Sequence, residues 1–443
     1  MNKQVQISEG AKYLLQEINQ VGEGYLVGGV VRDFLLGKKA HDEDICSSLL
    51  PEEVAKLFEH LPLIKAGLKH GTLGVHLGGS NYEITTYRVD GEYSDNRRPD
   101  KVEYTRSLRE DLARRDFTIN AMAMSAKGEI IDYFEGQKDL RAGLVRAVGD
   151  PYKRFTEDAL RLLRAVRFAN RLNFTIEEET EQAIRDKAAL LQNISAERIA
   201  DEFLKILLDN PQGVTRLHEL GLLQYCYPEL DACFNCPQEN RFHLYDVGRH
   251  SVATAEAHPD LIFRVAAILH DVGKPPSKTY GADGVAHFYG HAELSAQISK
   301  EILRKLFLPK KERQLIVSVV RWHDFLSKKP AKLARLLREE GPEFFALLFR
   351  LKRADIMAQS DYQRERKLRL VDLQEEIFQR QVQGPYRLAD LAINGKDLLD
   401  LGYCGAEIAE GLAETLAFVM EKPKRNQRDY LLARAERLKS EAK

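Results

Sequence analysis

The pattern of apolar and polar positions changes near residue 150. Residues 25–36 (YLVGGVVRDFLL) begin as an apolar run, turn through two glycines and continue as an amphipathic segment, which predicts a strand, a turn and a helix. Residues 74–89 alternate around a Gly-Gly-Ser-Asn turn and predict a β-hairpin. Residues 129–136 predict one more strand that ends in a turn. The N-terminal part of the chain is therefore expected to form a small domain around a mixed sheet.

After residue 150 the spacing of apolar residues becomes helical. Segments such as 157–172 (EDALRLLRAVRFANRL) and 195–210 (SAERIADEFLKILLDN) predict amphipathic helices, and we expect little β-structure from there to the end. Turn-rich stretches mark candidate junctions near Asp150-Pro151, at residues 235–243 and at residues 383–388. The expected fold class is α+β, with a mixed-sheet head (1–150), a helical neck and body (151–238), a third, helical domain (239–383) and a helical tail (384–443).

Composition and charge exclude several classes of protein. With 44% hydrophobic residues, the 443-residue chain can build large cores, which excludes a disordered protein. The 66 Lys and Arg nearly balance the 67 Asp and Glu, so contact with RNA must rest on local basic patches. No apolar run approaches the roughly 18 to 20 residues that span a bilayer, and MNKQVQISEG lacks the apolar core of a signal peptide. We therefore expect a cytoplasmic protein without membrane partners.

The cysteines are few and do not suggest a disulfide framework. Five occur in the chain, an odd and sparse set that agrees with a reducing compartment. Cys233 and Cys236 form the one C-x-x-C pair. Without a second such pair, two loop thiols are a better interpretation than a zinc or redox site.

The first candidate motif is the glycine turn of Gly28-Gly29-Val30-Val31-Arg32-Asp33. Glycines let the backbone approach a ligand closely, and the free N–H groups at a helix start favour an anion. Arg32, one turn later, could bind the same anion. An ordinary strand-to-helix turn is the alternative, and the motif alone does not decide between them.

Two aspartates follow that helix in His41-Asp42-Glu43-Asp44-Ile45. In a strand, Asp42 and Asp44 would share one face and Glu43 the other. Two carboxylates so placed repel each other unless a cation lies between them, and Mg²⁺ is commonly held by one or two carboxylates and substrate phosphates. A lone D-x-D is more often a solvated acidic loop, but the glycine turn upstream favours the metal site.

A third motif is Arg114-Arg115-Asp116-Phe117-Thr118-Ile119-Asn120-Ala121, in which a basic pair leads into an apolar segment. Arg115 could reach a sugar or a triphosphate through its planar set of donors. Glu83, on the predicted hairpin, is a candidate third carboxylate, although a surface glutamate on a strand is an equal alternative.

Taken together, GGVVRD, DED, GEYSDNRRPD and RRDFTINAMA resemble the head domain of the class II tRNA nucleotidyltransferases, which are the CCA-adding enzymes and their poly(A) polymerase relatives. The resemblance extends over most of the chain. It implies that Asp42 and Asp44 bind the catalytic Mg²⁺ ions and that Gly29, Arg32 and Arg115 contact the nucleotide. From the same motifs we add Gly28, Asp33 and Asn120 to the candidate nucleotide-binding residues.

The segment Glu157–Arg167 is expected to be one helix. Asp158, Arg161, Arg164 and Arg167 follow one another at intervals of three, which puts them on one ridge of a helix. A solvated surface with an internal ion pair is the alternative. The family resemblance implies instead that Asp158 and Arg161 imitate a base-pairing partner for CTP and ATP. Glu157 would orient them, and Arg164 and Arg167 would lie at the triphosphate.

Two further stretches resemble family elements. Residues 91–100 (GEYSDNRRPD) fit the flexible loop that helps the switch from CTP to ATP, and its presence argues against an enzyme that adds only CC. Residues 132–140 (DYFEGQKDL) resemble the hinge between head and neck.

A second candidate centre has histidine and aspartate in the order H…HD…D on predicted helices: His250, His270, Asp271 and Asp355. This order resembles the HD phosphohydrolase superfamily, which implies a divalent transition metal and a phosphatase or phosphodiesterase activity. Lys274, one turn after the His-Asp pair, could hold a phosphate. His291 and His323 are two more candidate ligands, although a single histidine is usually structural or exposed. A degenerate site retained for packing is the alternative.

The tail carries excess positive charge. Residues 421–443 contain eight Lys and Arg against four Asp and Glu, which suits contact with a phosphate backbone, although a solvated helix is an equal alternative. The candidate RNA-binding residues are Lys422, Lys424, Arg425 and Arg428. Residues 393–412 resemble the family's tail motif but lack the expected proline in CGAEI.

The sequence thus predicts template-independent addition of CCA to tRNA 3′ ends, with CTP, ATP and tRNA as partners and Mg²⁺ as cofactor. An A-adding enzyme and a poly(A) polymerase are the alternatives within the same class. A different class of hypothesis makes the HD domain the working part and the head a tRNA-binding module, but the intact D-x-D disfavours it.

Overall fold

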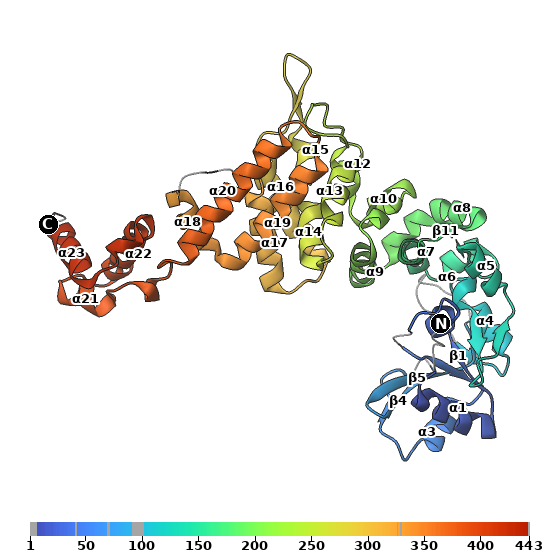
Figure 1. Ribbon diagram of the computed structural model, residues 1–443. Helices are drawn as coiled ribbons and strands as arrows, with labels where there is room; N and C mark the ends of the chain where they lie inside the picture. The colour runs from blue at the N-terminus through green and yellow to red at the C-terminus, as the bar shows by residue number, and fades with distance from the viewer. Residues whose placement is uncertain are drawn as a thin grey trace. The chain divides into compact units, whose positions relative to one another are not determined.

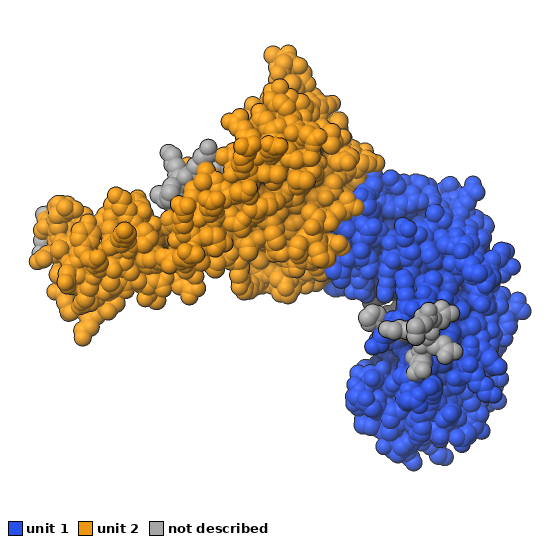
Figure 2. Space-filling view, in the orientation of Figure 1, with its two compact units in different colours: residues 1–228 blue, residues 229–443 orange. Residues whose placement is uncertain are grey.

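The structure of the protein is a computed structural model. It describes residues 7–39, 42–68, 71–90, 102–325, 327 and 330–441. The chain forms two compact units, Met1–Pro228 and Glu229–Lys443, which Figure 2 distinguishes by colour. Residues 91–100, expected to form the switching loop, lie outside the described residues.

The N-terminal unit is built on the predicted mixed sheet (Figure 1). Its seven strands have the order β3-β4-β5-β2-β1-β8-β9, and the pairing is antiparallel except between β2 and β5. The predicted hairpin is present as β4 and β5, which turn through Gly78 and Gly79 with positive φ. The strands are β1 (Gly24–Val27), β2 (Ile45–Ser47), β3 (Leu63–Ile64), β4 (Thr72–Leu77), β5 (Ser80–Thr86), β8 (Met122–Met124) and β9 (Ile130–Asp132).

Short helices pack around this sheet. The apolar side chains of α1 (Glu9–Val21) are buried at Leu14, Leu15 and Ile18, because they recur at helical spacing. The predicted glycine turn joins β1 to α2, and Gly28 caps that helix with a φ of 76°. The other elements of the head are α2 (Gly29–Leu35), α3 (Pro51–Leu57), β6 (Arg88–Asp90), β7 (Val102–Tyr104), α4 (Leu108–Ala113), η2 (Thr118–Asn120) and α5 (Gly136–Ala142).

The rest of the N-terminal unit is helical, apart from the short parallel pair β10 (Leu144–Val145) and β11 (Thr175–Ile176). Its helices are α6 (Pro151–Glu157), α7 (Leu160–Leu172), α8 (Glu178–Lys187), η3 (Ala188–Asn193), α9 (Ala196–Asp209), α10 (Gln212–Glu219) and α11 (Leu223–Cys226). Head and neck residues thus share one compact unit. The finer division expected at residue 150 stays a prediction.

The expectation of one helix over residues 157–167 is wrong. Helix α6 ends at Glu157, and Asp158 is extended, with φ −140° and ψ 101°, before α7 begins at Leu160. The Asp158 side chain accepts a hydrogen bond from Leu160 N at 3.1 Å, so it caps the following turn instead of continuing the ridge. Asp158 therefore precedes α7 and is not part of the helix that carries the three arginines.

The second unit is almost entirely helical, as expected. Helix α14 (Leu261–Leu269) buries most of its apolar run, and α19 (Pro342–Ala358) buries three phenylalanines. No helix among the described residues is long and apolar enough to cross a membrane. The remaining elements are α12 (Pro228–Phe234), α13 (Val247–Glu256), α15 (Lys274–Ser277), β12 (Thr279–Tyr280), β13 (Ala286–His287), α16 (His291–Lys305), α17 (Lys310–Trp322), α18 (Pro330–Glu340), α20 (Arg364–Val382), η4 (Leu388–Asp390), α21 (Gly395–Asp400), α22 (Ala406–Glu421), η5 (Pro423–Arg425) and α23 (Arg428–Glu441).

Candidate active site and metal centre

The acidic motif of the head lies in irregular backbone immediately before β2. The expectation that Asp42 and Asp44 sit within a strand is therefore wrong, because β2 begins only at Ile45. The sheet nevertheless brings a third carboxylate beside them. Strand β2 pairs in parallel with β5, with Ile45 opposite Ile84, so Asp44 and Glu83 precede neighbouring positions of adjacent strands. The candidate carboxylates thus lie near one another, where the chain enters β2 beside the middle of β5.

The middle residue of the motif has a separate partner. Glu43 accepts a hydrogen bond from Ser8 N at 2.9 Å and another from the Ser8 hydroxyl, which also contacts the Tyr82 hydroxyl at 3.0 Å. These contacts fix the Glu43 side chain against the start of α1. Asp42 and Asp44 remain exposed.

The electrostatics of this cluster suit a divalent cation. Partial loss of hydration and the negative charge of Glu83 raise the pKa of Asp44, and Asp42 adds to the effect while Arg115 opposes it. Like charges held together in this way are stabilised when a cation neutralises them. All three donors are hard carboxylate oxygens, the ligand type that Mg²⁺ prefers.

The glycine turn and the third motif meet in the structure. A Cβ atom on Gly28 would lie 3.2 Å from Nη1 of Arg115, so glycine permits the close approach of this guanidinium. Arg115 makes only a long contact, 3.4 Å, to Asp111, and its buried Nε has no hydrogen-bond partner among the described residues. The Arg115 side chain, one fifth exposed, is thus held only weakly by the described residues.

Arg32, which is predicted to bind an anion, has its donors directed to protein partners. It is 3% exposed, donates from Nε and Nη2 to Asp33 Oδ1 at 2.9 and 2.8 Å, and donates from Nη1 to Asn120 Oδ1 at 2.7 Å. A buried guanidinium needs such partners, because an unpaired charge in the interior is costly. The three candidate residues form an internal bridge between the first and third motifs.

This bridge continues to helix α7 through a buried aspartate. Asn120 Nδ2 donates to Asp116 Oδ1 at 3.2 Å, and Arg164 donates to Asp116 Oδ2 at 2.9 and 2.6 Å. Burial alone would raise the pKa of Asp116, but the Arg164 charge and these hydrogen bonds lower it to about 2. Arg167 donates to Glu202 at 2.6 Å, and both side chains are buried. Sequence reasoning did not identify Asp116 or Glu202 as partners, because no local pattern pairs them with these arginines.

Asp158 and Arg161, the candidate nucleotide-selecting pair, each have a protein partner. Arg161 pairs with Glu157 at 2.8 Å and donates to the carbonyl oxygens of Arg154 and Arg114 at 2.9 and 2.8 Å. Asp158 accepts from Arg198 at 2.8 Å. Arg198 was not anticipated from the sequence, since it comes from another helix.

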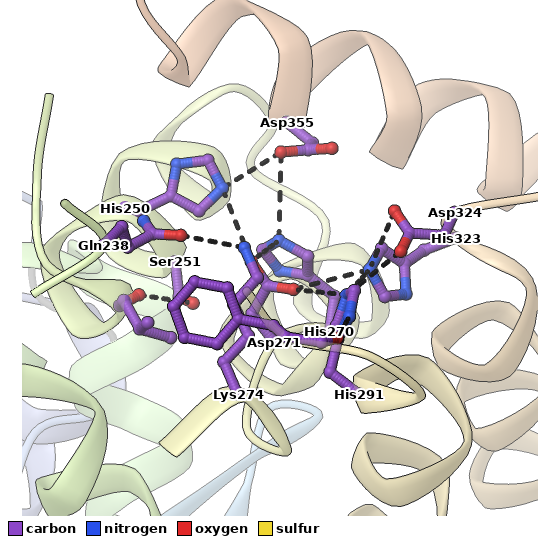
Figure 3. A network of polar contacts seen from close by, with 12 residues as sticks. Gln238, His250, Ser251, His270, Asp271, Lys274, His291, His323, Asp324 and Asp355 are labelled. Atoms are coloured by element: carbon purple, nitrogen blue, oxygen red, sulfur yellow. Dashed lines mark hydrogen bonds and ion pairs between the residues drawn. The ribbon is translucent and has the colours of Figure 1, made fainter. Parts of the chain in front are cut away.

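The six candidate ligands of the second centre come together in one network of the C-terminal unit (Figure 3). His250, His270 and Asp355 place ligand atoms within 4.8 Å of one another, and so do Asp271, His291 and His323. The two sets of ligands are adjacent, because Nε2 of His270 in the first set lies 3.1 Å from Oδ2 of Asp271 in the second. The geometry can therefore accommodate a pair of metal ions.

The histidines of this centre are oriented for coordination. His270, His291 and His323 each place Nδ1 2.6 to 2.8 Å from the carbonyl oxygen three residues earlier. A carbonyl only accepts, so Nδ1 carries a hydrogen and Nε2 is the nitrogen left to bind a metal. Nε2 of His270 and Oδ1 of Asp271 are buried without a hydrogen-bond partner among the described residues. These atoms fit a divalent transition metal.

Asp324, which sequence reasoning missed, belongs to the same network. Its Oδ2 lies 3.1 Å from Nε2 of His291 and its Oδ1 3.6 Å from Nε2 of His323. Burial would lower the pKa of His291, but Asp271 and Asp324 raise it to about 10, and the two histidines lower the pKa of Asp324 to about 2. The adjacent pair His323-Asp324 repeats the His-Asp spacing of residues 270–271 and was the available signal.

A pocket of about 470 Å³ opens beside these ligands. Lys274, buried and 2.6 Å from Asp271, lines it, and Lys367 lines it from α20. Phe242, Phe288 and Tyr289 supply aromatic walls. The pocket thus combines metal-binding groups with positive charges that suit a phosphate.

The candidate RNA-binding residues of the tail differ in how free they are. Arg428 is tied to Asp397 at 2.6 Å, and the Arg425 guanidinium lies 4.1 Å from the centroid of the Phe418 ring. Lys422 and Lys424 are exposed and line a hollow of about 510 Å³ together with Tyr430. The two lysines are the more available to a phosphate backbone.

Comparison with known families matches three parts of the chain. Residues 24–146 match the poly A polymerase head domain, residues 173–234 match the probable RNA and SrmB-binding site of polymerase A, and residues 242–360 match the HD domain.

Similar proteins agree with these matches. The chain is 51% identical over 216 residues to the CCA-adding enzyme of Ligilactobacillus salivarius, covering 48% of this chain and 53% of that protein. It is 54% identical over 194 residues to the CCA-adding enzyme of Lactobacillus helveticus, covering 44% and 48%. The alignments thus span about half the length of these curated relatives. The crystal structure of the Bacillus stearothermophilus CCA-adding enzyme in complex with CTP matches with a TM-score of 0.71 and 29% identity over 98% of both chains.

These matches define a class: a chain that joins a poly A polymerase head domain to an HD domain. Within that class, the resemblance to the class II tRNA nucleotidyltransferases is confirmed, and the fold of the chain is that of a CCA-adding enzyme.

Proposed function

We propose that the protein adds CCA to the 3′ ends of tRNA, using CTP and ATP and releasing pyrophosphate. The observation that carries this proposal is the cluster of Asp42, Asp44 and Glu83 where the chain enters β2 beside β5, with Arg115 against the neighbouring glycine turn. Carboxylates that can bind a divalent cation, beside a guanidinium that has one long protein contact, suit transfer from a nucleoside triphosphate.

Each part of the head has a defined task in this reaction. Asp42 and Asp44, assisted by Glu83, would hold Mg²⁺, which lowers the pKa of the primer hydroxyl and stabilises charge on the triphosphate. The Arg115 guanidinium binds the nucleotide. Gly28 and Gly29 let the phosphates of the nucleotide approach the backbone. Catalysis then rests on positioning and electrostatics.

Nucleotide selection is assigned to Asp158 and Arg161. An aspartate accepts from the exocyclic amine of cytosine or adenine, whereas uracil and guanine carry a carbonyl there. Asp158 would exchange Arg198 for the base, while Glu157 holds Arg161 in place through their 2.8 Å ion pair. Arg164, with a third of its side chain exposed, can reach a phosphate, whereas buried Arg167 supports it through their shared partner Glu202.

The test uses purified protein and two tRNA primers, one ending at the discriminator base and one ending in CC. The protein should add two C residues to the first primer with CTP alone and one A to the second with ATP. Addition of A without any C would indicate an A-adding enzyme, and a long A tail would indicate a poly(A) polymerase. Asp42→Ala should abolish incorporation, and its retention would contradict the site assignment.

A second activity is favoured by the HD centre. We propose that it hydrolyses phosphoesters with a divalent transition metal, on the strength of the oriented histidines and of the buried atoms of His270 and Asp271 that make no hydrogen bond to the described residues. Lys274 and Lys367 would bind the phosphate. His270→Ala should remove phosphohydrolase activity and leave nucleotide incorporation intact. Phosphohydrolase activity in His270→Ala equal to that of the wild type would contradict the proposal.

The tail is proposed to contact the tRNA backbone through Lys422 and Lys424, which are exposed next to Tyr430. The cytoplasm, where tRNA and nucleoside triphosphates meet, is the proposed location.

A further inference from the structure

One aromatic ring lies where the head motifs meet helix α7. Phe168, in α7, is 5% exposed. Three guanidinium carbons lie near its ring centroid: Arg32 at 5.2 Å, Arg164 at 5.3 Å and Arg167 at 4.4 Å. Phe117, which belongs to the third motif, packs edge-on against it with centroids 5.8 Å apart.

Each of these arginines also belongs to the internal bridge of ion pairs. Arg32 is held by Asp33, Arg164 by Asp116 and Arg167 by Glu202. The carboxylates fix one end of each guanidinium, and an aromatic face within about 6 Å attracts the cation itself. Three guanidinium charges held close together repel one another, and a neutral ring that attracts all three stabilises the cluster.

The three arginines differ in access to a ligand. The side chains of Arg32 and Arg167 are 4% and 10% exposed, whereas that of Arg164 is 33% exposed. Arg164 is therefore the member of the group that can reach an incoming nucleotide, and Phe168 contacts it together with its buried neighbours.

We propose that Phe168 is a positioning residue for nucleotide binding: its ring holds Arg164 in register with Arg32, so that the nucleoside triphosphate meets preformed donors. This proposal rests on the proposed nucleotidyl transfer. The ring itself does not touch the reacting atoms. Its contribution is to reduce the freedom that the guanidinium loses when the triphosphate binds.

The test replaces the ring while keeping an apolar side chain. Phe168→Leu should raise KM for CTP and for ATP about three- to tenfold, the range expected for losing one or two cation–π contacts, with kcat changed less than twofold. Phe168→Tyr, which keeps the ring, should restore KM toward the wild-type value. Phe155→Leu removes another fully buried ring of the same unit and should lower the melting temperature without raising KM.

Equilibrium binding of CTP in the presence of Mg²⁺ tests the positioning role of Phe168 separately from the proposed nucleotidyl transfer. If wild-type protein binds CTP but incorporates none, the proposed activity fails, and the ratio of CTP affinities between wild type and Phe168→Leu still tests the ring. If Phe168→Leu keeps wild-type KM and affinity, or if Phe155→Leu raises KM equally, the positioning role of Phe168 is contradicted.

Discussion

The two candidate metal centres hold their carboxylates in opposite ways. In the head, Asp42 and Asp44 are exposed, and the charge of Glu83 raises the pKa of Asp44. In the HD centre, Asp271 is buried, and the charges of His270 and Lys274 hold its pKa well below the usual range despite that burial. An exposed cluster of like charges suits a cation that binds together with the triphosphate. A buried cluster whose carboxylates are already paired with cationic side chains suits a metal that stays bound.

The largest expected effect comes from neutralising the head cluster. Asp44→Asn should reduce nucleotide incorporation about 10³-fold, because several kcal/mol of charge stabilisation depend on the carboxylates. Removing a repelling charge should leave the free energy of unfolding nearly unchanged. Single-turnover incorporation and thermal unfolding measure both, with the exposed Asp201→Asn as control.

A carboxylate of the HD centre that lies against a buried histidine should respond differently to the same change. Asp355→Asn removes the charge that faces His250 at 2.9 Å, so unfolding of the metal-free protein should require about 3 kcal/mol less free energy. The exposed Asp361→Asn should change it by less than about 0.5 kcal/mol. Urea unfolding in EDTA distinguishes them, and equal stability of the two variants would remove the contrast between the centres.

The pH dependence of metal binding should also differ. Asp271 and Asp324 raise the pKa of His291 to about 10, so below that pH the metal-free site holds a proton that the metal must displace. Affinity for Zn²⁺ or Mn²⁺ should therefore fall about tenfold for each unit that the pH drops between 8 and 6. Asp324→Asn should flatten this slope. The Mg²⁺ requirement of incorporation should vary less, because carboxylates ordinarily titrate near pH 4.

The smallest expected effect concerns the tail. Replacing Lys422 and Lys424 by alanine should weaken tRNA binding severalfold and reduce the slope of log affinity against log salt by about one per lysine. Arg428→Ala, which removes a residue already paired with Asp397, should change the slope less. Titrations of tRNA binding at several salt concentrations measure this slope. Identical slopes in the wild type and in all variants would exclude the tail from the tRNA interface.

The sequence predicted features that depend on local pattern. Spacing along the sequence predicts the glycine turn at Gly28 and the hairpin of β4 and β5. It also predicts the helices that carry His250 and His270. The internal partners could not be predicted, because Asp116 and Glu202 reach their arginines, and Arg198 reaches its aspartate, only through tertiary packing. The break at Asp158 was missed because its side chain competes with the helix backbone, an effect that periodicity does not register.

The central claim is that one chain carries two independent metal centres of different character. The most direct measurement is elemental analysis of wild type, Asp42→Ala and His270→Ala after dialysis against metal-free buffer. Wild type and Asp42→Ala should retain a transition metal, and His270→Ala should lose it. Loss of that metal in Asp42→Ala, or full retention in His270→Ala, would contradict the account.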